Sequence, residues 1–179
     1  DAEAVLEKYS VRDRCAFEIN FLIETPKEEK YFERVENILF VANRNALQAM
    51  ESYANKAGYK TKIKTAIIAG EAREIGERVA EEIKNEVSKT VLLYGGETTV
   101  TLRGKGQGGR NQELILSALK SVGEKQLVAA VASDGRDNTD FAGAIADTFT
   151  QKKAKEKNLD IGKYLSDNDS YNFFRVTGD

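Results

Sequence analysis

The run of residues 104–110 combines the residue types that proteins use to bind anions. Its members are Gly104, Lys105, Gly106, Gln107, Gly108, Gly109 and Arg110. The run lies between an expected strand and an expected helix, and backbone N–H groups at a helix N-terminus favour an anion. Glycine lets a phosphate approach the backbone, and arginine can bind phosphate or carboxylate oxygens through two nitrogens. The run therefore predicts an anion site, and a flexible turn into the helix is the alternative.

The same run also matches the glycine pattern of dinucleotide-binding loops, through Gly104, Gly106 and Gly109. Asp134 stands 30 residues after the first of these glycines, beyond a further strand, where a ribose hydroxyl could meet it. The strand before the run is, however, expected to be the second arm of a tight hairpin and not the first strand of a βαβ unit. Because the glycine pattern itself matches, an NAD(P)-dependent oxidoreductase stays open as an alternative.

Two further groups of polar residues follow apolar strands. Gly95, Gly96 and Glu97 come after the apolar residues 91–94. Open α/β sheets bind ligands beyond the carboxyl ends of their strands. Glu97 is therefore expected to orient Arg110, to hold a metal through water or to cap the turn. The helix after the glycine run begins Arg110-Asn111-Gln112-Glu113, and these groups either reach into a site or serve as ordinary first-turn residues.

An acidic loop at residues 133–140 follows another buried strand and contains Asp134, Asp137 and Asp140. One or two such carboxylates can bind Mg²⁺ while the ion keeps several waters. The same residues can act in acid–base chemistry or form Asx turns. Asp137 and Asp140 are the candidate metal ligands, and turn formation is the equal alternative.

The composition excludes several mechanisms. The 179 residues contain no His and one Cys, which rules out Ser-His-Asp and Cys-His catalysis and cysteine- or histidine-based zinc sites. Lys and Arg number 27 and Asp and Glu number 29, so the net charge of −2 points to neither a nucleic acid nor a membrane partner. No apolar run approaches the roughly 18 residues of a membrane span. We expect a cytoplasmic protein.

The elements that must position these residues are predicted from hydrophobic periodicity. Strands alternate with helices, which is typical of an α/β fold with a mostly parallel sheet flanked by helices. The short connection after residue 94 predicts a hairpin-like excursion near 91–103. The expected helices are 1–25 (one or two), 43–57, 71–86, 110–121, 142–150 and 161–166, and the expected strands are 38–41, 61–68, 91–94, 98–103 and 126–132.

Some single residues are predicted from their place in these elements. Arg73 and Glu77 are spaced to pair on the solvated face of their helix. Met50 and Tyr53 are expected in the core. Phe173 and Phe174 are expected there too, and the preceding residues 168–169 are expected to cap a helix.

Taken together, these segments resemble the glycerate kinases that carry a MOFRL domain. The resemblance covers nearly the whole chain, and several motifs stand in the family's order. They are Gly95-Gly96-Glu97-Thr98-Thr99, Gly108-Gly109-Arg110-Asn111-Gln112-Glu113, Ser133-Asp134-Gly135 with Thr139-Asp140, and Asn168-Asp169-Ser170-Tyr171 with Phe173-Phe174.

The resemblance implies ATP-dependent phosphorylation of D-glycerate to 2-phosphoglycerate with Mg²⁺. Arg110 matches the family's functional arginine, and phosphoryl transfer needs positioning and charge neutralisation more than covalent chemistry. Glu97 and Asp134 would orient Arg110 or a metal-bound water, and Asp137 and Asp140 would be the metal ligands. The expected substrate- or phosphate-binding residues are Asn43, Gly95, Gly96, Gly104, Lys105, Gly106, Gly108, Gly109 and Asn111.

The resemblance also predicts a domain plan. Residues 1–88 would end the family's preceding kinase domain and residues 89–179 would form a MOFRL-like domain, truncated at its C-terminal end. We expect a fragment that lacks its N-terminal kinase domain and is inactive alone, with glycerate as substrate and a homodimer as one assembly. The alternatives are an NAD(P)-dependent hydroxypyruvate reductase and a non-catalytic ligand-binding module.

Overall fold

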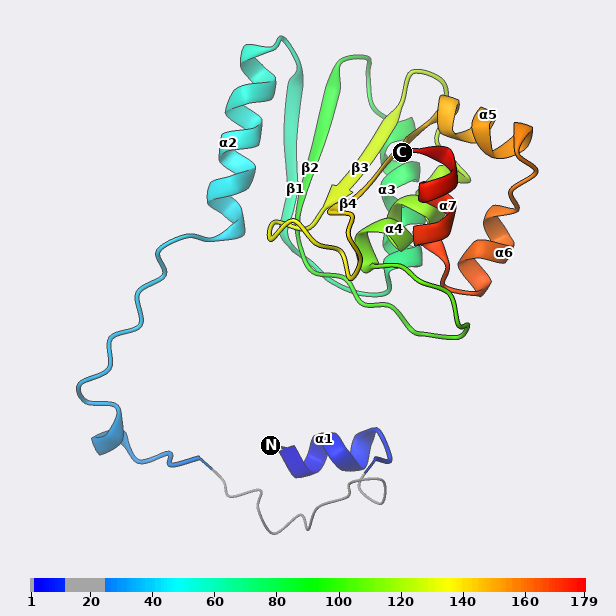
Figure 1. The fold of residues 1–179 in the computed structure, drawn as a ribbon. Helices are drawn as coiled ribbons and strands as arrows, with labels where there is room; N and C mark the ends of the chain where they lie inside the picture. The colour runs from blue at the N-terminus through cyan, green and yellow to red at the C-terminus, as the bar shows by residue number, and fades with distance from the viewer. Residues whose placement is uncertain (1, 12–24) are drawn as a thin grey trace. The chain divides into compact units, whose positions relative to one another are not determined.

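The computed structural model describes residues 2–11 and 25–179. The chain divides into two compact units, residues 1–40 and 41–179. In the described part of the first unit, the helices are α1 (Ala2–Lys8) and the 3₁₀ helix η3 (Glu29–Tyr31) (Figure 1). The rest of the helical region predicted before residue 25 lies mostly outside the described residues. No helix in the described part of the chain is long and apolar enough to cross a membrane.

The second unit begins with a helix and two parallel strands. Strands β1 (Lys60–Ile68) and β2 (Thr90–Gly96) pair in parallel, from Lys60 opposite Thr90 to Ile68 opposite Gly96. Helix α2 (Asn43–Lys56) packs against both strands. Helix α3 (Ala72–Lys84) connects them, as a parallel pair requires. The predicted α/β class and the parallel pairing are confirmed.

A second pair of strands is antiparallel. Strand β3 (Leu127–Val131) pairs with β4 (Gly143–Asp147). The helix predicted over 142–150 is therefore wrong in its first half, because residues 143–147 alternate in burial as a strand does. Helix α5 (Thr148–Glu156) begins only after Asp147, whose carboxylate caps it by accepting from the N–H groups of Phe149 and Thr150.

The hairpin predicted near 91–103 is wrong. Residues 98–103 form no strand beside β2, and Thr99 instead makes an isolated parallel bridge with Glu71. The Ala72 N–H donates to Thr99 O, and the Glu71 carboxylate accepts from the N–H and hydroxyl of Thr101. The β-branched residues of this segment thus line the turn after β1 and lead the chain directly to the glycine run.

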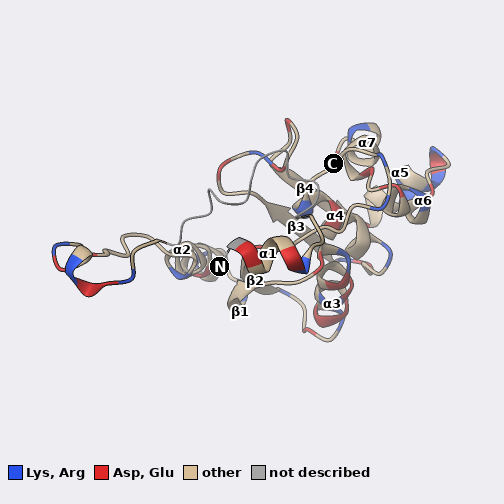
Figure 2. Cartoon of the chain, turned by 90° about the horizontal axis from the view of Figure 1, so that it is seen from below, with Lys and Arg blue, Asp and Glu red and all other residues tan. Residues whose placement is uncertain are grey.

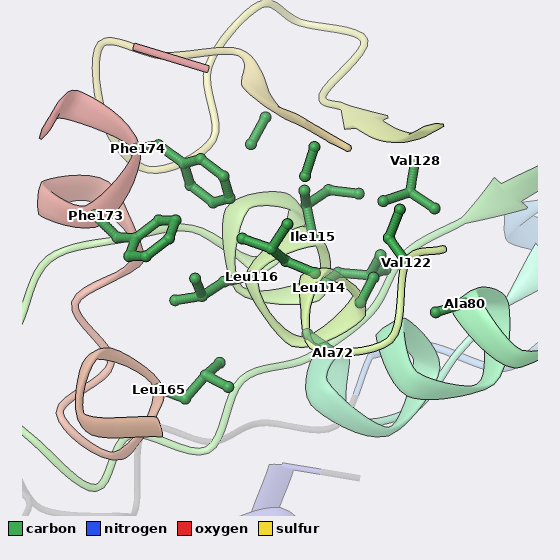
Figure 3. Close-up of a cluster of buried hydrophobic side chains, with 14 of the residues drawn as sticks. Ala72, Ala80, Leu114, Ile115, Leu116, Val122, Val128, Leu165, Phe173 and Phe174 are labelled. Carbon is green, nitrogen blue, oxygen red and sulfur yellow. The ribbon is translucent and has the colours of Figure 1, made fainter. Parts of the chain in front are cut away.

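The core surrounds helix α4 (Arg110–Leu119), which packs against α3 on one side and against β3 and β4 on the other. Phe173 and Phe174 are fully buried beside it (Figure 3), as predicted, and their rings meet edge to face with centroids 5.2 Å apart. They belong to α7 (Ser170–Thr177), which follows α6 (Ile161–Ser166). Acidic residues mark the outer part of α3 in Figure 2.

Apolar residues 38–41, predicted as a strand, and two residues predicted in the core are exposed. Residues 38–41 form no strand, and Phe40 has 90% of its surface exposed. Met50 and Tyr53 lie on the outer side of α2, with exposed fractions of 52% and 79%. The helical spacing of these residues predicted the helix correctly but not which side of it meets the sheet.

Candidate functional site

An open cleft of about 960 Å³ lies at the N-terminus of α4. Its walls come from the segment after β2, from the glycine run and from the acidic loop after β3. The cleft therefore unites three segments that the sequence analysis singled out separately. The predicted site residues that line it are Gly106, Gly108, Gly109, Arg110, Asp134, Asp137 and Asp140.

Arg110, which lines the cleft, forms an ion pair with Glu97, which is not itself among the lining residues. A guanidinium nitrogen of Arg110 lies 2.6 Å from Glu97 Oε1, and the side chains are 49% and 69% exposed. An exposed pair of this kind adds little to stability, with a typical value of about 0–1 kcal/mol. The arrangement keeps the arginine accessible while limiting its orientation, which suits the binding of an anion from solution.

Asp137 is buried beneath the glycine run and caps α4. One carboxylate oxygen accepts from the Asn111 N–H at 3.1 Å and from Asn111 Nδ2 at 3.0 Å, and the other accepts from the Gln112 N–H at 2.8 Å. The residue is 3% exposed. A carboxylate at a helix N-terminus is favoured by the unpaired N–H groups and by the helix dipole.

Most of the glycine run already has acceptors from the protein itself. The N–H groups of Arg103 and Gly104 donate to Asn168 Oδ1 at 2.7 and 3.0 Å. Those of residues 105 and 106 donate to Asp167 Oδ1 and O, and that of Gln107 donates to Asp169 Oδ1. The prediction that amides throughout 104–109 hold an external anion is therefore wrong for residues 104–107.

The glycines of the run serve close packing. A Cβ added at Gly104 would collide with the backbone of Asp167, and one added at Gly108 would collide with Ser170 Oγ. At Gly109 the added atom would meet Asp137. Glycine is needed here because the acceptor segments approach the backbone so closely.

The end of the run is the part that remains able to bind an anion. Among the described residues, the N–H groups of Gly108, Gly109 and Arg110 have no hydrogen-bond partner. Their residues precede or begin a buried helix, and all three are among those that line the cleft. Three adjacent donors and one guanidinium are a suitable set for phosphate or carboxylate oxygens.

The acidic loop gives its carboxylates different roles. Asp134 Oδ1 accepts from the Arg136 N–H at 3.1 Å, which is the Asx turn expected as an alternative. The Asp140 carboxylate beside the Tyr171 hydroxyl raises the pKa of that phenol. Both oxygens of Asp137 already accept from the start of α4, which leaves them less suited to the predicted Asp137–Asp140 metal pair. Within residues 2–11 and 25–179 there is no group of three or more acidic, histidine or cysteine ligands. The metal role of Asp140 stays a prediction.

Several predicted binding residues lie away from the cleft. Asn43 does not cap α2, because Ala42 is the N-cap, and its Nδ2 donates to Ala66 O at 3.2 Å. Gly95 faces Leu47 and Gly96 faces Ile68. The cleft lining likewise does not include Gly104, Lys105 or Asn111.

Three residues of this cleft were not predicted as site residues from the sequence. Asn168 and Tyr171 line the cleft from the segment before and within α7, and Arg136 lines it from the acidic loop. Asp169 is the N-cap residue of α7, as predicted, although its side chain makes no cap hydrogen bond. The polar run before two aromatics was the available signal, but its partners are more than 60 residues away along the chain.

The fold and cleft define an α/β protein whose accessible arginine and helix N-terminus suit an anionic substrate. The family model described as "MOFRL family" matches residues 90–179. Glycerate 2-kinase of Pyrococcus horikoshii is 34% identical and D-glycerate 2-kinase of Thermotoga maritima is 36% identical, and each alignment covers 99% of this chain and 44% of the relative. The chain belongs to the MOFRL family.

A solved structure supports the same relationship. The crystal structure of glycerate kinase from Thermotoga maritima matches with a TM-score of 0.72 at 31% identity. The match covers 99% of this chain and 44% of that one. This chain therefore spans less than half the length of the relatives it matches.

Proposed function

We propose that this chain forms the C-terminal part of a cytoplasmic glycerate 2-kinase, which transfers a phosphoryl group from ATP to D-glycerate and yields 2-phosphoglycerate and ADP. The observation that carries the proposal is the cleft that combines Arg110 with the N–H groups of residues 108–110. Relatives named as glycerate 2-kinases match along nearly the whole chain and support it. An N-terminal kinase domain would supply the rest of the site.

Arg110 would neutralise charge on the phosphoryl group or the glycerate carboxylate. A guanidinium needs no proton transfer to do so, which agrees with a chain that has no histidine. Glu97 would limit the rotation of Arg110 before the substrate binds. The N–H groups of residues 108–110 would donate to oxygens of the same anion, and such fixed donors stabilise developing charge without reorganising.

The two predicted metal ligands of the described acidic loop are poorly suited to a resident Mg²⁺ ion. Both oxygens of Asp137 accept from the start of α4, and Asp140 lies beside the Tyr171 hydroxyl. We therefore assign no step to a metal held by these residues. The phosphates of ATP fit better, because the three N–H groups lack acceptors of their own and the half-exposed guanidinium of Arg110, paired with Glu97, has further N–H groups for an anion.

The reductase alternative has lost its basis in the glycine pattern. Gly104, Gly106 and Gly109 follow an irregular segment and pack against Asp167, Asp169 and Asp137. A dinucleotide fingerprint instead follows the first strand of a βαβ unit and leaves its amides to the pyrophosphate. The kinase is therefore the better supported function.

The test is an ADP-release assay with the protein encoded by the complete gene, supplied with ATP, Mg²⁺ and D-glycerate. We expect turnover that falls at least tenfold in R110A, since a hydrogen bond to a charged group contributes about 1.5–3 kcal/mol. R78A is the matched control, because Arg78 is also a half-exposed arginine beside a glutamate but lies on α3. Absence of glycerate-dependent ADP formation would refute the proposal, and equal losses in both variants would remove Arg110 from it. NAD(P)H oxidation with hydroxypyruvate would favour the reductase.

The 179-residue chain alone is the second arm of this test. We expect it to release no ADP, because it spans only 44% of the length of its kinase relatives. Measurable turnover by the chain would show that its own residues form a complete site.

A further inference from the structure

Glu113 is a buried carboxylate directly beneath the site. It follows Arg110 by one helical turn on α4, yet its side chain is only 3% exposed. Oε1 lies 2.5 Å from Arg73 Nε, and Oε2 accepts from Asn168 Nδ2 at 3.0 Å. Arg73 also donates to the Leu165 carbonyl. The predicted Arg73–Glu77 surface pair is thus wrong, and Arg73 turns inward to hold Glu113.

The chemistry of its neighbours fixes the orientation of the Asn168 amide. On one side lies the Glu113 carboxylate, which can only accept, so the NH₂ group must face it. On the other side lie the N–H groups of Arg103 and Gly104, which can only donate, so Oδ1 must face them. Neither an inverted amide nor a carboxylate satisfies both sides.

We propose that Glu113 and Asn168, supported by Arg73, are positioning residues that fix the segment 103–107 and so set the place of Arg110 for phosphoryl transfer. This proposal rests on the proposed function. Asn168 holds the start of the glycine run, the run leads without a break into Arg110, and Glu113 is attached to the same helix as Arg110. The network therefore ties both sides of the arginine to one buried carboxylate.

The burial of this carboxylate argues for a specific task. A buried ion pair adds little net stability compared with apolar residues of similar size, because two charges must be desolvated. It does impose a definite arrangement on its hydrogen-bond partners. Here the arrangement that it imposes is that of the loop before Arg110, since Asn168 connects the two directly.

A reciprocal exchange of charge tests the proposal. N168D places a second carboxylate against Glu113, so the bonds to Arg103 and Gly104 should weaken. E113Q/N168D should restore the bonds between position 113, position 168 and the two backbone N–H groups, but not the longer bond from position 168 to the Thr101 carbonyl. The new amide at position 113 donates to the new carboxylate and accepts from Arg73, and the carboxylate still accepts from both backbone N–H groups. N85D, at an exposed asparagine after α3, is the control for an added charge.

Amide hydrogen exchange of the 179-residue chain is the first measurement, because it does not depend on the proposed activity. We expect exchange at Arg103 and Gly104 at least tenfold faster in N168D, unchanged in N85D and returned to within threefold of wild type in E113Q/N168D. Exchange within α5 should be equal in all four proteins. If N168D does not fold, E113Q alone should show the faster exchange. Wild-type exchange in N168D, or no recovery in the double variant, would overturn the proposal.

The second measurement is glycerate-dependent ADP release by the protein of the complete gene. We expect kcat to fall at least tenfold in N168D and to recover in E113Q/N168D, with a smaller change in the KM for ATP. An active wild type whose kcat does not follow the exchange pattern would overturn the positioning role. An inactive wild type with the expected exchange pattern would refute the proposed function while leaving the network in place.

Discussion

Removal of the Asp137 carboxylate should destabilise the chain far more than removal of its neighbour Asp134. Both residues stand in the same acidic loop. Asp137 is 3% exposed and accepts three hydrogen bonds at the start of α4, whereas Asp134 is exposed and accepts one bond from its own turn. Because α4 is buried along residues 112–119, loss of its cap acts on the whole core.

The expected cost follows from these contacts. Replacing a helix cap by Ala costs about 0.5–2 kcal/mol, and leaving a buried donor unsatisfied costs about 1–3 kcal/mol. The terms overlap, so D137A should lose about 3 kcal/mol. D137N should lose about half of that. The amide oxygen still accepts from one side of the helix start, whereas the NH₂ group now faces an N–H donor and cannot accept from it. D134A should change the free energy of unfolding by about 0.5 kcal/mol or less, as is usual for an exposed residue.

Urea unfolding of the 179-residue chain, followed by circular dichroism, measures these differences from the midpoint at an unchanged slope. The order D137A, D137N, D134A is the result that supports the cap. Equal midpoints for D137A and D134A would refute the reasoning. They would mean that the N–H groups at the start of α4 find water or another acceptor without any loss of stability.

Three other substitutions test separate parts of the structure. R110A should change the free energy of unfolding by less than about 1 kcal/mol, because the Arg110–Glu97 pair is exposed, and a larger loss in urea unfolding would contradict a purely functional role. G76A should lose about 1–3 kcal/mol in the same assay, since an added Cβ would collide with the Leu114 carbonyl where α3 meets α4, while G162A in α6 should be neutral. Burial and the hydrogen bond to Glu82 raise the pKa of Tyr94. The stabilising contribution of the protonated phenol is therefore complete below about pH 10, which is the pKa of an unfolded tyrosine, and is lost as the pH rises further. Unfolding titrations should therefore show a shallower alkaline loss of stability in Y94F, and an identical loss would exclude Tyr94 as its source.

The sequence predicted elements well where local pattern and tertiary packing agree. Helix α4 and the strand at 127–131 were expected within a few residues of their observed bounds. The failures occurred where the two disagree. Residues 98–103 are rich in β-branched residues but pair with the turn at Glu71, and residues 143–147 are rich in small residues but pair with β3. Pairing partners of this kind are set by the sheet and are not visible in the local sequence.

The location of the site could be predicted from the sequence, but the hydrogen-bond partners of its residues could not. Arg110 and its helix N-terminus were found from the glycine run, because that pattern has a local physical cause. The acceptors of the run, Asp167 to Asp169, are about 60 residues distant, and no local pattern indicates that they would occupy its amides. Asp137 was expected to bind a metal because an exposed carboxylate and a capping carboxylate have the same sequence signature.

The role of Arg73 bears on how the chain is divided. The boundary predicted at residue 88 agrees with the family match, which begins at residue 90, and stays a prediction about the family's domain plan. Within this chain, however, α3 contributes Ala72, Ile75 and Ala80 to the same core as α4. Removing α3 would leave Glu113 buried without its arginine, and breaking a buried ion pair costs about 3–5 kcal/mol. A total stability of about 5–15 kcal/mol leaves little room for that loss. Helix α3 is therefore part of what holds the N-terminal end of α4 in place, so the position of Arg110 depends on a helix that lies before the family match at residues 90–179.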